Sequence, residues 1–305
     1  KFIDPPAANS EIRVEYFKSI NLLKAQDRIN LAYAPTGDNF GNTLGQLMTG
    51  VDYGGVEVTS FAFGGTTGWN SAPWMAQGWD IFDSDFEDEG VSVFGLHNSV
   101  MTIGDTFLEI VAPTQADTTA GRLLERMGGD GGYMILVQTD DIDFYRSHTE
   151  KLGVRKIWQA DRENVKAFHM HPKDLGATIV SIDWMAPQEE WEWAGAGWQS
   201  RGSKYVDKIT AVDVQCHDQL TTARHWATAL NQPVQLEGDI HVMRMGAGKV
   251  NFVEALDDRG EGVCGIEFRV RDWVAIKAKA EMLGLNWQGN ELMVAGTRFR
   301  FVDAD

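Results

Sequence analysis

GYMILVQTDDIDFYRSHTEKLG, residues 132–153, is the stretch that decides the fold. An apolar run of strand length leads into two aspartates that can cap a helix, and then into a segment whose apolar residues recur at helical spacing. Three segments of strand composition follow, at residues 154–160, 165–171 and 176–184. The stretch therefore predicts a unit made of a strand, a helix and three further strands.

The same order of elements recurs twice further along the chain. The second unit starts at residue 209 with the predicted helix 219–231, and the third starts at residue 263 with the predicted helix 273–284. Ahead of all three, VSVFGLHNSVMTIGDTFLEIVAP (91–113) matches only the closing two strands of a unit. Internal repeats of this length predict repeated structural modules. We expect a β-rich segment at 1–89, one domain at 90–187 with an incomplete first unit, a linker at 188–205, and a second domain at 206–305.

Composition limits the partners. The chain has 305 residues and a formal net charge of -17, with no Lys/Arg cluster. Nucleic acid phosphates and anionic membranes would repel such a protein. No apolar run reaches the length of about 18 residues that a membrane helix needs. Two cysteines fit a reducing compartment. We therefore expect a cytoplasmic protein with a small-molecule ligand or substrate, no nucleic acid and no membrane, and a homo-oligomer stays open.

The paired units resemble the vicinal oxygen chelate superfamily. Within it, GVSVFGLHNSVMTIGDTFLEIVAP, RLLERMGGDGGYMILVQTDDID and FHMHPKDLGATIVSID are similar to the glyoxalase-like branch. The resemblance covers about residues 90–303 and implies that two units form a half-open barrel of eight strands around a metal or substrate. The expected fold class is α+β: tandem βαβββ units paired into two half-barrel domains, with the first unit truncated, behind a β-rich N-terminal segment.

Residues 1–89 resemble something different. NLAYAPTGDNFGNTLGQLMTGVDYGGVEV and GWNSAPWMAQGWDIFDSDFEDE are similar to virion structural proteins of tailed bacteriophages. This resemblance implies a structural or assembly role, with virion proteins as partners and the virion as the location. The join FEDEGVSVFGLHN falls where both resemblances stop short, so a recombined fusion is a further explanation.

Candidate site residues emerge when EIVAP is aligned with DWMAP. Glu109 then corresponds to Asp183, and a histidine stands twelve residues before each acid, His97 (109 − 97) and His171 (183 − 171). His169 lies two residues before His171 and so shares its sheet face. Each histidine falls on the third strand of its unit and each acid on the fourth, where adjacent strands bring side chains together. We expect all five side chains to point into the first barrel.

Two kinds of chemistry fit these residues. Imidazole and carboxylate are ligands for Zn²⁺, Ni²⁺, Fe²⁺ or Mn²⁺. By resemblance, a divalent metal held by His97, Glu109, His171 and Asp183 would bind a substrate's vicinal oxygens, while Glu109 and Asp183 move the proton. However, the opening strands YMILVQ, TAVDVQ and CGIEFR carry no histidine, the usual opening-strand ligand of that family. In one alternative, His97, His169 and His171 line a metal-free polar cavity, where they form hydrogen bonds to the acids or the backbone and can bind a ligand. In another, these side chains are buried without a function.

Three functions follow from these interpretations. The first is a glyoxalase-like enzyme of the lyase, isomerase or dioxygenase class, with its site in the first barrel. The second is a module of the same fold that binds a small ligand without catalysis. The third is a virion structural protein in which residues 1–89 decide the role.

Overall fold

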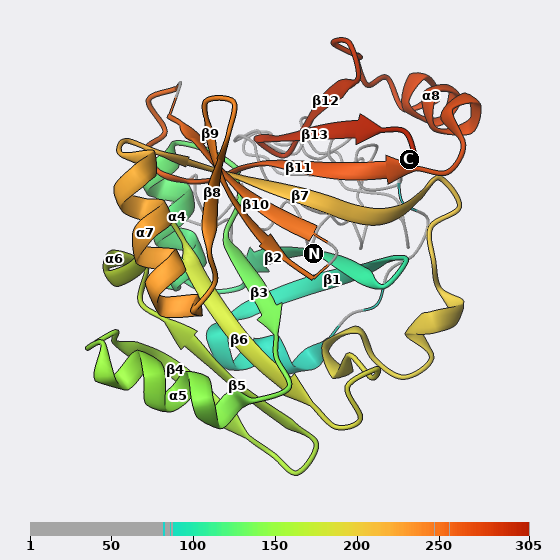
Figure 1. The fold of residues 1–305 in the computed structure, drawn as a ribbon. Coiled ribbons are helices and arrows are strands. Elements are labelled where there is room, and N and C mark those ends of the chain that lie inside the picture. The colour runs from blue at the N-terminus through green and yellow to red at the C-terminus, as the bar shows by residue number, and fades with distance from the viewer. Residues whose placement is uncertain (1–81, 83–85, 87, 247, 256, 305) are drawn as a thin grey trace.

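The computed structural model describes residues 82, 86, 88–246, 248–255 and 257–304 (Figure 1). The expectations for residues 1–81, including the β-rich segment and the resemblance to virion proteins, lie outside the described residues. Three sheets and several helices make up the described part, so the predicted α+β class is confirmed.

The unit predicted from residues 132–184 forms as expected. Its elements are β3 (Met134–Gln138), α5 (Ile142–Lys151), β4 (Lys156–Asp161), β5 (Val165–Met170), the short α6 (Pro172–Leu175) and β6 (Ile179–Met185). The four strands form one sheet in the order β3-β6-β5-β4, with β3 parallel to β6. The side chain of Asp141 accepts a 2.9 Å hydrogen bond from the Phe144 N–H, which is the predicted helix cap.

The second half contains the two later units. Their elements are β7 (Val206–Cys216), α7 (Gln219–Leu230), β8 (Val234–Glu237), β9 (Ile240–Met245), β10 (Gly248–Glu254), β11 (Gly262–Val270), α8 (Trp273–Met282), β12 (Glu291–Val294) and β13 (Thr297–Val302). The opening strands β7 and β11 pair antiparallel in the middle of a sheet ordered β12-β13-β11-β7-β10-β9-β8. This sheet has seven strands rather than eight, because residues 285–288 contribute only an isolated bridge between Gln288 and Glu291.

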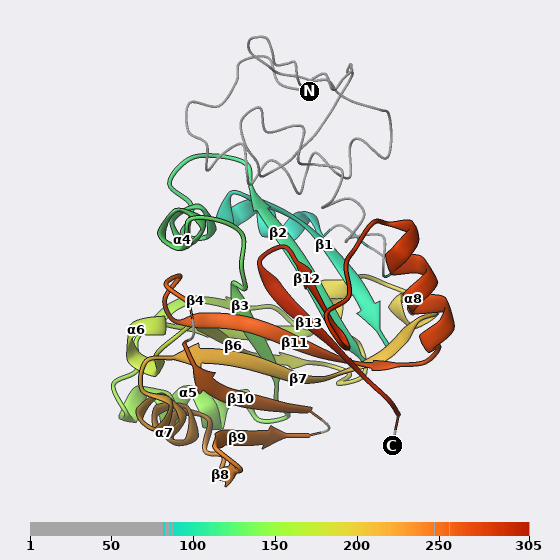
Figure 2. The same cartoon turned by 90° about the horizontal axis from the view of Figure 1, so that it is seen from above.

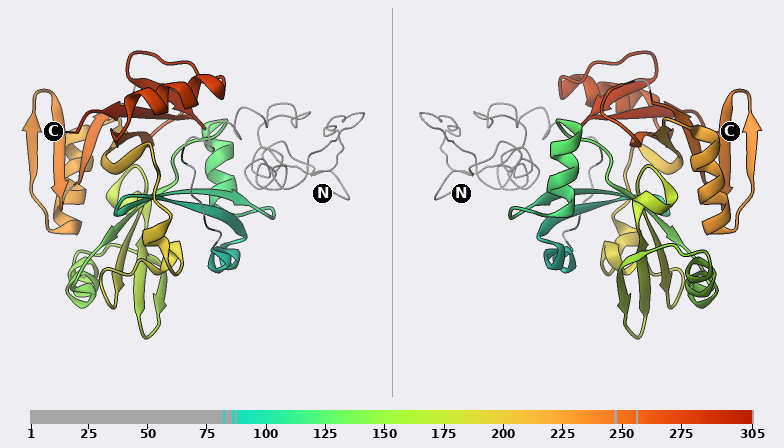
Figure 3. Two further views of the ribbon diagram at one scale, coloured as in Figure 1. Left: turned by 90° about the vertical axis from the view of Figure 1, so that its right-hand side faces the viewer. Right: turned by 90° about the vertical axis from the view of Figure 1, so that its left-hand side faces the viewer.

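The described residues ahead of β3 include the two closing strands that were predicted for the first unit. The elements of this part are η3 (Glu89–Phe94), β1 (Leu96–Ile103), β2 (Thr106–Pro113) and α4 (Thr119–Met127). The helix α4 is capped by Thr118 and was not expected from the sequence. Within the described part of the chain, β1 and β2 form a separate two-stranded sheet that is not hydrogen-bonded to β3. Figure 3 shows this hairpin between the seven-stranded and the four-stranded sheet.

Two hydrophobic cores hold the sheets together. In the first, side chains of β5, β6 and α5 pack against those of β7, α7 and β10, and the helices α5, α6 and α7 lie side by side (Figures 1 and 3). At its centre Trp226 is fully buried and contacts Phe252 edge-on at 5.4 Å. The second core joins Phe82 and Met101 to β11, α8 and β13. Both cores contain residues from either side of 188–205.

The segment 188–205 packs against its surroundings through tryptophans. It contains two short 3-10 helices, η4 (Glu192–Ala194) and η5 (Trp198–Ser200). Trp191 stacks on Phe107 of β2 at 5.7 Å, and Trp198 meets the same ring edge-on at 5.0 Å. This packing places Trp193 beside β6, where its ring N–H donates a hydrogen bond to Asp183. None of the helices in the described ranges is long and apolar enough to cross a membrane.

Candidate functional site

A cleft of about 1310 Å³ lies among β2, β3, β7 and β10, and its lining is mostly apolar. Figure 2 shows these strands, which belong to the three different sheets. Three of the five predicted site residues line this cleft: Glu109, His169 and Asp183. His97 and His171 are not among its lining residues.

Glu109 is held in place by a buried amide. The Asn98 side chain on β1 donates from Nδ2 to Oε2 of Glu109 at 2.9 Å, and its own oxygen accepts the Asp88 N–H at 2.9 Å. Removal from water raises the pKa of Glu109 from 4.5 to about 7; the Asn98 bond lowers it, and the charges of Asp88 and Asp183 raise it further. Glu109 therefore changes charge near neutral pH.

Asp183 is more deeply enclosed, with 1 % of its surface exposed. The Ser181 hydroxyl donates to Oδ1, and the Trp193 ring N–H donates to Oδ2 at 2.6 Å. Burial raises the pKa of Asp183 from 3.8 to about 6, although both hydrogen bonds act in the opposite direction. Since protein donors engage both of its oxygens, Asp183 acts on the cleft mainly through its charge.

His169 forms one end of the cleft together with two aromatic rings. It lies 4.5 Å from Trp158 and stacks on Phe94 at 5.8 Å, measured between ring centroids. Burial lowers the pKa of His169 from 6.5 to about 4, so the imidazole is neutral at pH 7. His169 pairs with Ser181 across β5 and β6, and Ala167, two residues earlier, pairs with Asp183. Because side chains two residues apart on a strand lie on the same face, His169 and Asp183 share one face of the sheet, as predicted.

His97 does not join Glu109, which corrects the first predicted pair. The β1–β2 hairpin places Glu109 opposite Val100 and His97 opposite Ala112. The offset of three residues between His97 and Val100 is odd, so the His97 side chain points to the opposite face of the hairpin. The residue that reaches Glu109 is its neighbour Asn98.

His171 does not join Asp183 either, which corrects the second pair. β5 ends at Met170, and Pro172, which cannot donate to a strand ladder, opens α6. His171 caps this helix, with Nδ1 accepting the Lys173 N–H at 3.0 Å. The strand partner of Asp183 is Ala167.

The four residues implied as metal ligands therefore do not fit a metal. His97 faces away, His171 is a helix cap, and protein donors occupy both oxygens of Asp183. Across the residues that the structure describes, no group of three or more His, Cys, Asp or Glu side chains is arranged to hold a metal ion. The donor set that remains in the cleft is suited to proton transfer rather than to coordination.

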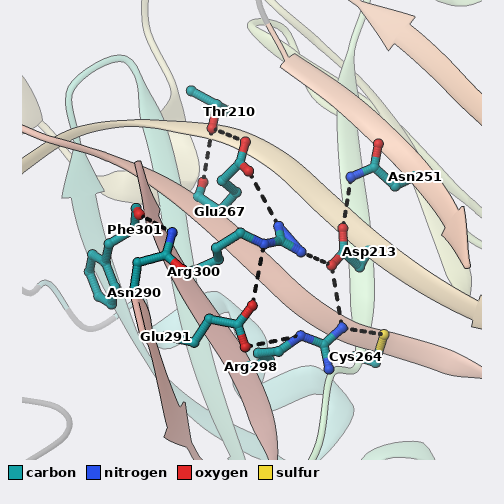
Figure 4. Close-up of polar contacts among 10 residues, drawn as sticks. All are labelled: Thr210, Asp213, Asn251, Cys264, Glu267, Asn290, Glu291, Arg298, Arg300 and Phe301. Atoms are coloured by element: carbon teal, nitrogen blue, oxygen red, sulfur yellow. Dashed lines mark hydrogen bonds and ion pairs between the residues drawn. The ribbon is translucent and has the colours of Figure 1, made fainter. Parts of the chain in front are cut away.

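One face of the seven-stranded sheet carries a network of ion pairs that the sequence did not predict (Figure 4). Asp213 on β7 is 1 % exposed and accepts from Arg300 and, at 2.8 Å, from Asn251. Arg300 also lies 3.3 Å from Glu267 and 3.6 Å from Glu291. This network links the five strands β10, β7, β11, β13 and β12.

Comparisons with known proteins support the fold. No family model and no curated protein matches the sequence. Among solved structures, a hypothetical protein from Staphylococcus aureus is 11% identical with a TM-score of 0.53, over 74% of this chain and 92% of that one. The chain thus shares its fold with a solved protein.

Two enzymes are also among the similar structures, at TM-scores too low to carry an argument. A 4-hydroxymandelate synthase variant from Streptomyces coelicolor has a TM-score of 0.46 and 16% identity, over 63% of this chain and 64% of that one. A Mn(II)-bound glyoxalase from Novosphingobium aromaticivorans has a TM-score of 0.46 and 10% identity, over 70% and 76%.

The sequence did not point to Tyr133 and Trp158, which line the cleft, or to Asn98, which bonds to Glu109. Asn98 could have been found by building the hairpin outward from its turn at residues 103–105, because register fixes which side chains share a face. Tyr133 stands immediately before β3, the opening strand of its unit. The family resemblance implies a metal-binding histidine on that strand, and the strand has none. Nothing in the sequence singles out Trp158.

Glu109→Gln is expected to stabilise the protein above about pH 7 and to have little effect below about pH 5. The pKa of Glu109 is about 7 in the folded chain against the ordinary 4.5. The folded state therefore binds the proton more tightly, and stability falls as pH rises through this window. Since tenfold in proton affinity is about 1.4 kcal/mol, the loss is at most roughly 3 kcal/mol, reduced by solvent screening.

Denaturant unfolding of the wild type and of Glu109→Gln, above about pH 7 and below about pH 5, measures this effect. Glu150→Gln, an isosteric change of an exposed residue on α5, is the control and should show no such pH dependence. A Glu109→Gln protein that follows the wild-type pH dependence would contradict the raised pKa.

Proposed function

We propose that this chain is an enzyme that moves a proton on a small, largely apolar carbonyl compound, in an isomerase or lyase type of reaction. The observation that carries the proposal is the state of Glu109. Its carboxyl group lines a mostly apolar cleft, is fixed by Asn98, and has a pKa of about 7. A general base works best when its pKa lies near the working pH.

The hydrogen bonding of Glu109 leaves one oxygen for the substrate. Asn98 engages Oε2, and no hydrogen bond from within the described ranges engages Oε1. An ionised Glu109 can therefore take a proton from a carbon next to a carbonyl group and return it to the same or a neighbouring carbon. Buried in apolar surroundings, the carboxylate is a stronger base than it would be in water.

The other cleft residues orient the substrate and tune the base. The rings of Phe94, Trp158 and His169 form an apolar wall against which the body of the substrate packs. Burial keeps the proton affinity of Glu109 high, and the negative charge of Asp183 adds to this effect. In this proposal Asp183 is a positioning residue, and the proton itself moves through Glu109.

Exchange of carbon-bound hydrogen with deuterated water, followed by NMR, tests the proposal. The full chain is incubated with a panel of small ketones and aldehydes that have apolar bodies. We expect catalysed exchange with at least one compound, a rate that rises with pH to a plateau above about pH 7, and a loss of about 100-fold or more in Glu109→Gln. A metal chelator should leave the rate unchanged, because the cleft residues do not form a ligand set.

Glu150→Gln, the exposed glutamate of α5, is the matched control and should keep the wild-type rate. A panel that binds in the cleft without any exchange would refute the enzyme and favour the ligand-binding module. Exchange that stops when metal is removed would refute a mechanism in which Glu109 acts as the base without a metal.

A further inference from the structure

Proton abstraction beside a carbonyl group moves negative charge to the carbonyl oxygen. An enzyme that catalyses this step needs a hydrogen-bond donor at the place where the charge develops. The requirement rests on the proposed function. The described residues contain no metal-ligand set that could supply a positive charge at this place, so the donor has to be another protein group.

Tyr133 lines the same cleft as Glu109. It immediately precedes β3, and its backbone carbonyl is fixed by the Thr178 hydroxyl at 2.7 Å. Its phenol is close enough to Glu109 to sense its charge. Burial, with the Glu109 charge second, raises the pKa of Tyr133 from 10.0 to about 12, so the O–H keeps its proton throughout the working range.

The hydroxyl of Tyr133 has no hydrogen-bond partner among the described residues. Tyrosine hydroxyls in enclosed positions usually form a hydrogen bond. The other polar groups beside the two carboxyl groups are engaged: Asn98 with Glu109, and Ser181 and Trp193 with Asp183. None of the hydrogen bonds that the described residues form uses the Tyr133 hydroxyl, so it is left for a ligand.

We propose that Tyr133 is a catalytic residue whose hydroxyl donates a hydrogen bond to the substrate oxygen that becomes negative. In the step, the substrate C–H bond breaks and its proton passes to the Glu109 carboxylate. The electron pair of that bond forms a C=C bond, and the carbonyl π pair moves onto the oxygen. Tyr133 keeps its own proton, and return of the proton from Glu109 completes the isomerisation without any oxidant or reductant.

A binding experiment tests the donor separately from catalysis. Glu109→Gln resembles the protonated base, and 4-nitrophenolate carries its charge on an oxygen attached to an sp² carbon, as an enolate does. Titrated above the pKa of the free phenol, the Glu109→Gln protein should bind this probe at least about 10-fold more tightly than Glu109→Gln with Tyr133→Phe. Nitrobenzene, which lacks the charged oxygen, should bind both proteins equally. Equal affinity for 4-nitrophenolate, or no binding to either protein, would overturn the role of Tyr133.

The exchange assay provides the second readout. Tyr133→Phe in the otherwise unchanged chain should lower the rate by roughly 10- to 100-fold. Tyr205→Phe, the same change at a residue that packs beside the second core, is the control. If Glu109→Gln abolishes exchange while Tyr133→Phe keeps the rate, the role of Tyr133 fails and the proposed function stands. If the wild-type chain exchanges nothing, the proposed function fails, and the phenolate titration still decides whether Tyr133 is a donor.

Discussion

Asp213→Ala is expected to lower the free energy of unfolding by about 3–5 kcal/mol. The Asp213 side chain is 2% exposed and is contacted by two arginines, Arg298 at 3.4 Å and Arg300 at a shorter distance. Without it, Arg300 keeps only partly exposed acids as partners, and the amide of Asn251 loses its acceptor. The loss comes chiefly from leaving charged and polar groups partly buried without their partner, and less from the attraction between the charges themselves.

Urea unfolding of both proteins measures this difference. Asp105→Ala is the matched control, because Asp105 also pairs with a cation, Lys208 at 2.6 Å, but is 68% exposed. An exposed pair is worth about 1 kcal/mol or less. Equal losses in the two variants would show that the network around Asp213 is as dispensable as a surface ion pair.

Trp226→Ala should cost about 3–5 kcal/mol, the range for removing a large aromatic side chain from a core. Trp226 on α7 is fully buried against Phe252, and its ring N–H donates to the Gly176 carbonyl at 3.3 Å. Gly176 lies in the unit that forms the four-stranded sheet. The Trp226 side chain therefore connects the halves of the chain before and after residues 188–205. The variant should lose packing on both sides of the predicted linker.

Thermal unfolding and near-UV circular dichroism follow this change. Leu220→Ala on the same helix is the control, since Leu220 is 39% exposed and its truncation leaves no core cavity. Two separate unfolding transitions in Trp226→Ala, against one in the wild type, would show that the halves come apart. A loss below about 1 kcal/mol would mean that the first core does not depend on this ring.

The repeat could be read from the sequence because local signals carry it. An aspartate before each helix sits at the same point of the three units, and the side chains of Asp141, Asp218 and Asp272 all accept the predicted cap hydrogen bond. Residues 285–288 follow the helix of the third unit, where the repeated order of elements predicts a strand, and they form a single bridge. Whether this segment pairs along its length depends on the tertiary structure around it, which its composition does not encode.

The site was harder to predict because it depends on register. Counting residues between a histidine and an acid ignores where each strand turns and ends. The hairpin turn puts His97 on the wrong face, and Pro172 removes His171 from its strand. His169, Glu109 and Asp183 each stand within a regular strand and line the cleft, whose walls come from both halves of the described chain and not from the first predicted barrel alone.

The ion-pair network around Asp213 could not be predicted from the sequence either. Asp213, Glu267 and Arg300 lie on three different strands, and the sequence separation between them exceeds any local pattern. Only the sheet order brings them together. The predictions on nucleic acid, membranes, homo-oligomers and cellular location, and the virion alternative that rests on residues 1–89, stay predictions.

The place of Phe82 has a consequence for where this chain can be cut. Its ring is 2% exposed and lies 4.9 Å from Phe268 in the second core, and the Phe86 carbonyl accepts the Val100 N–H at 2.8 Å. Both residues come before the boundary at 90 that sequence composition suggests. A fragment that starts at residue 90 would lack a core ring and an edge bridge, so an expression clone of the C-terminal region has to begin upstream of Phe82.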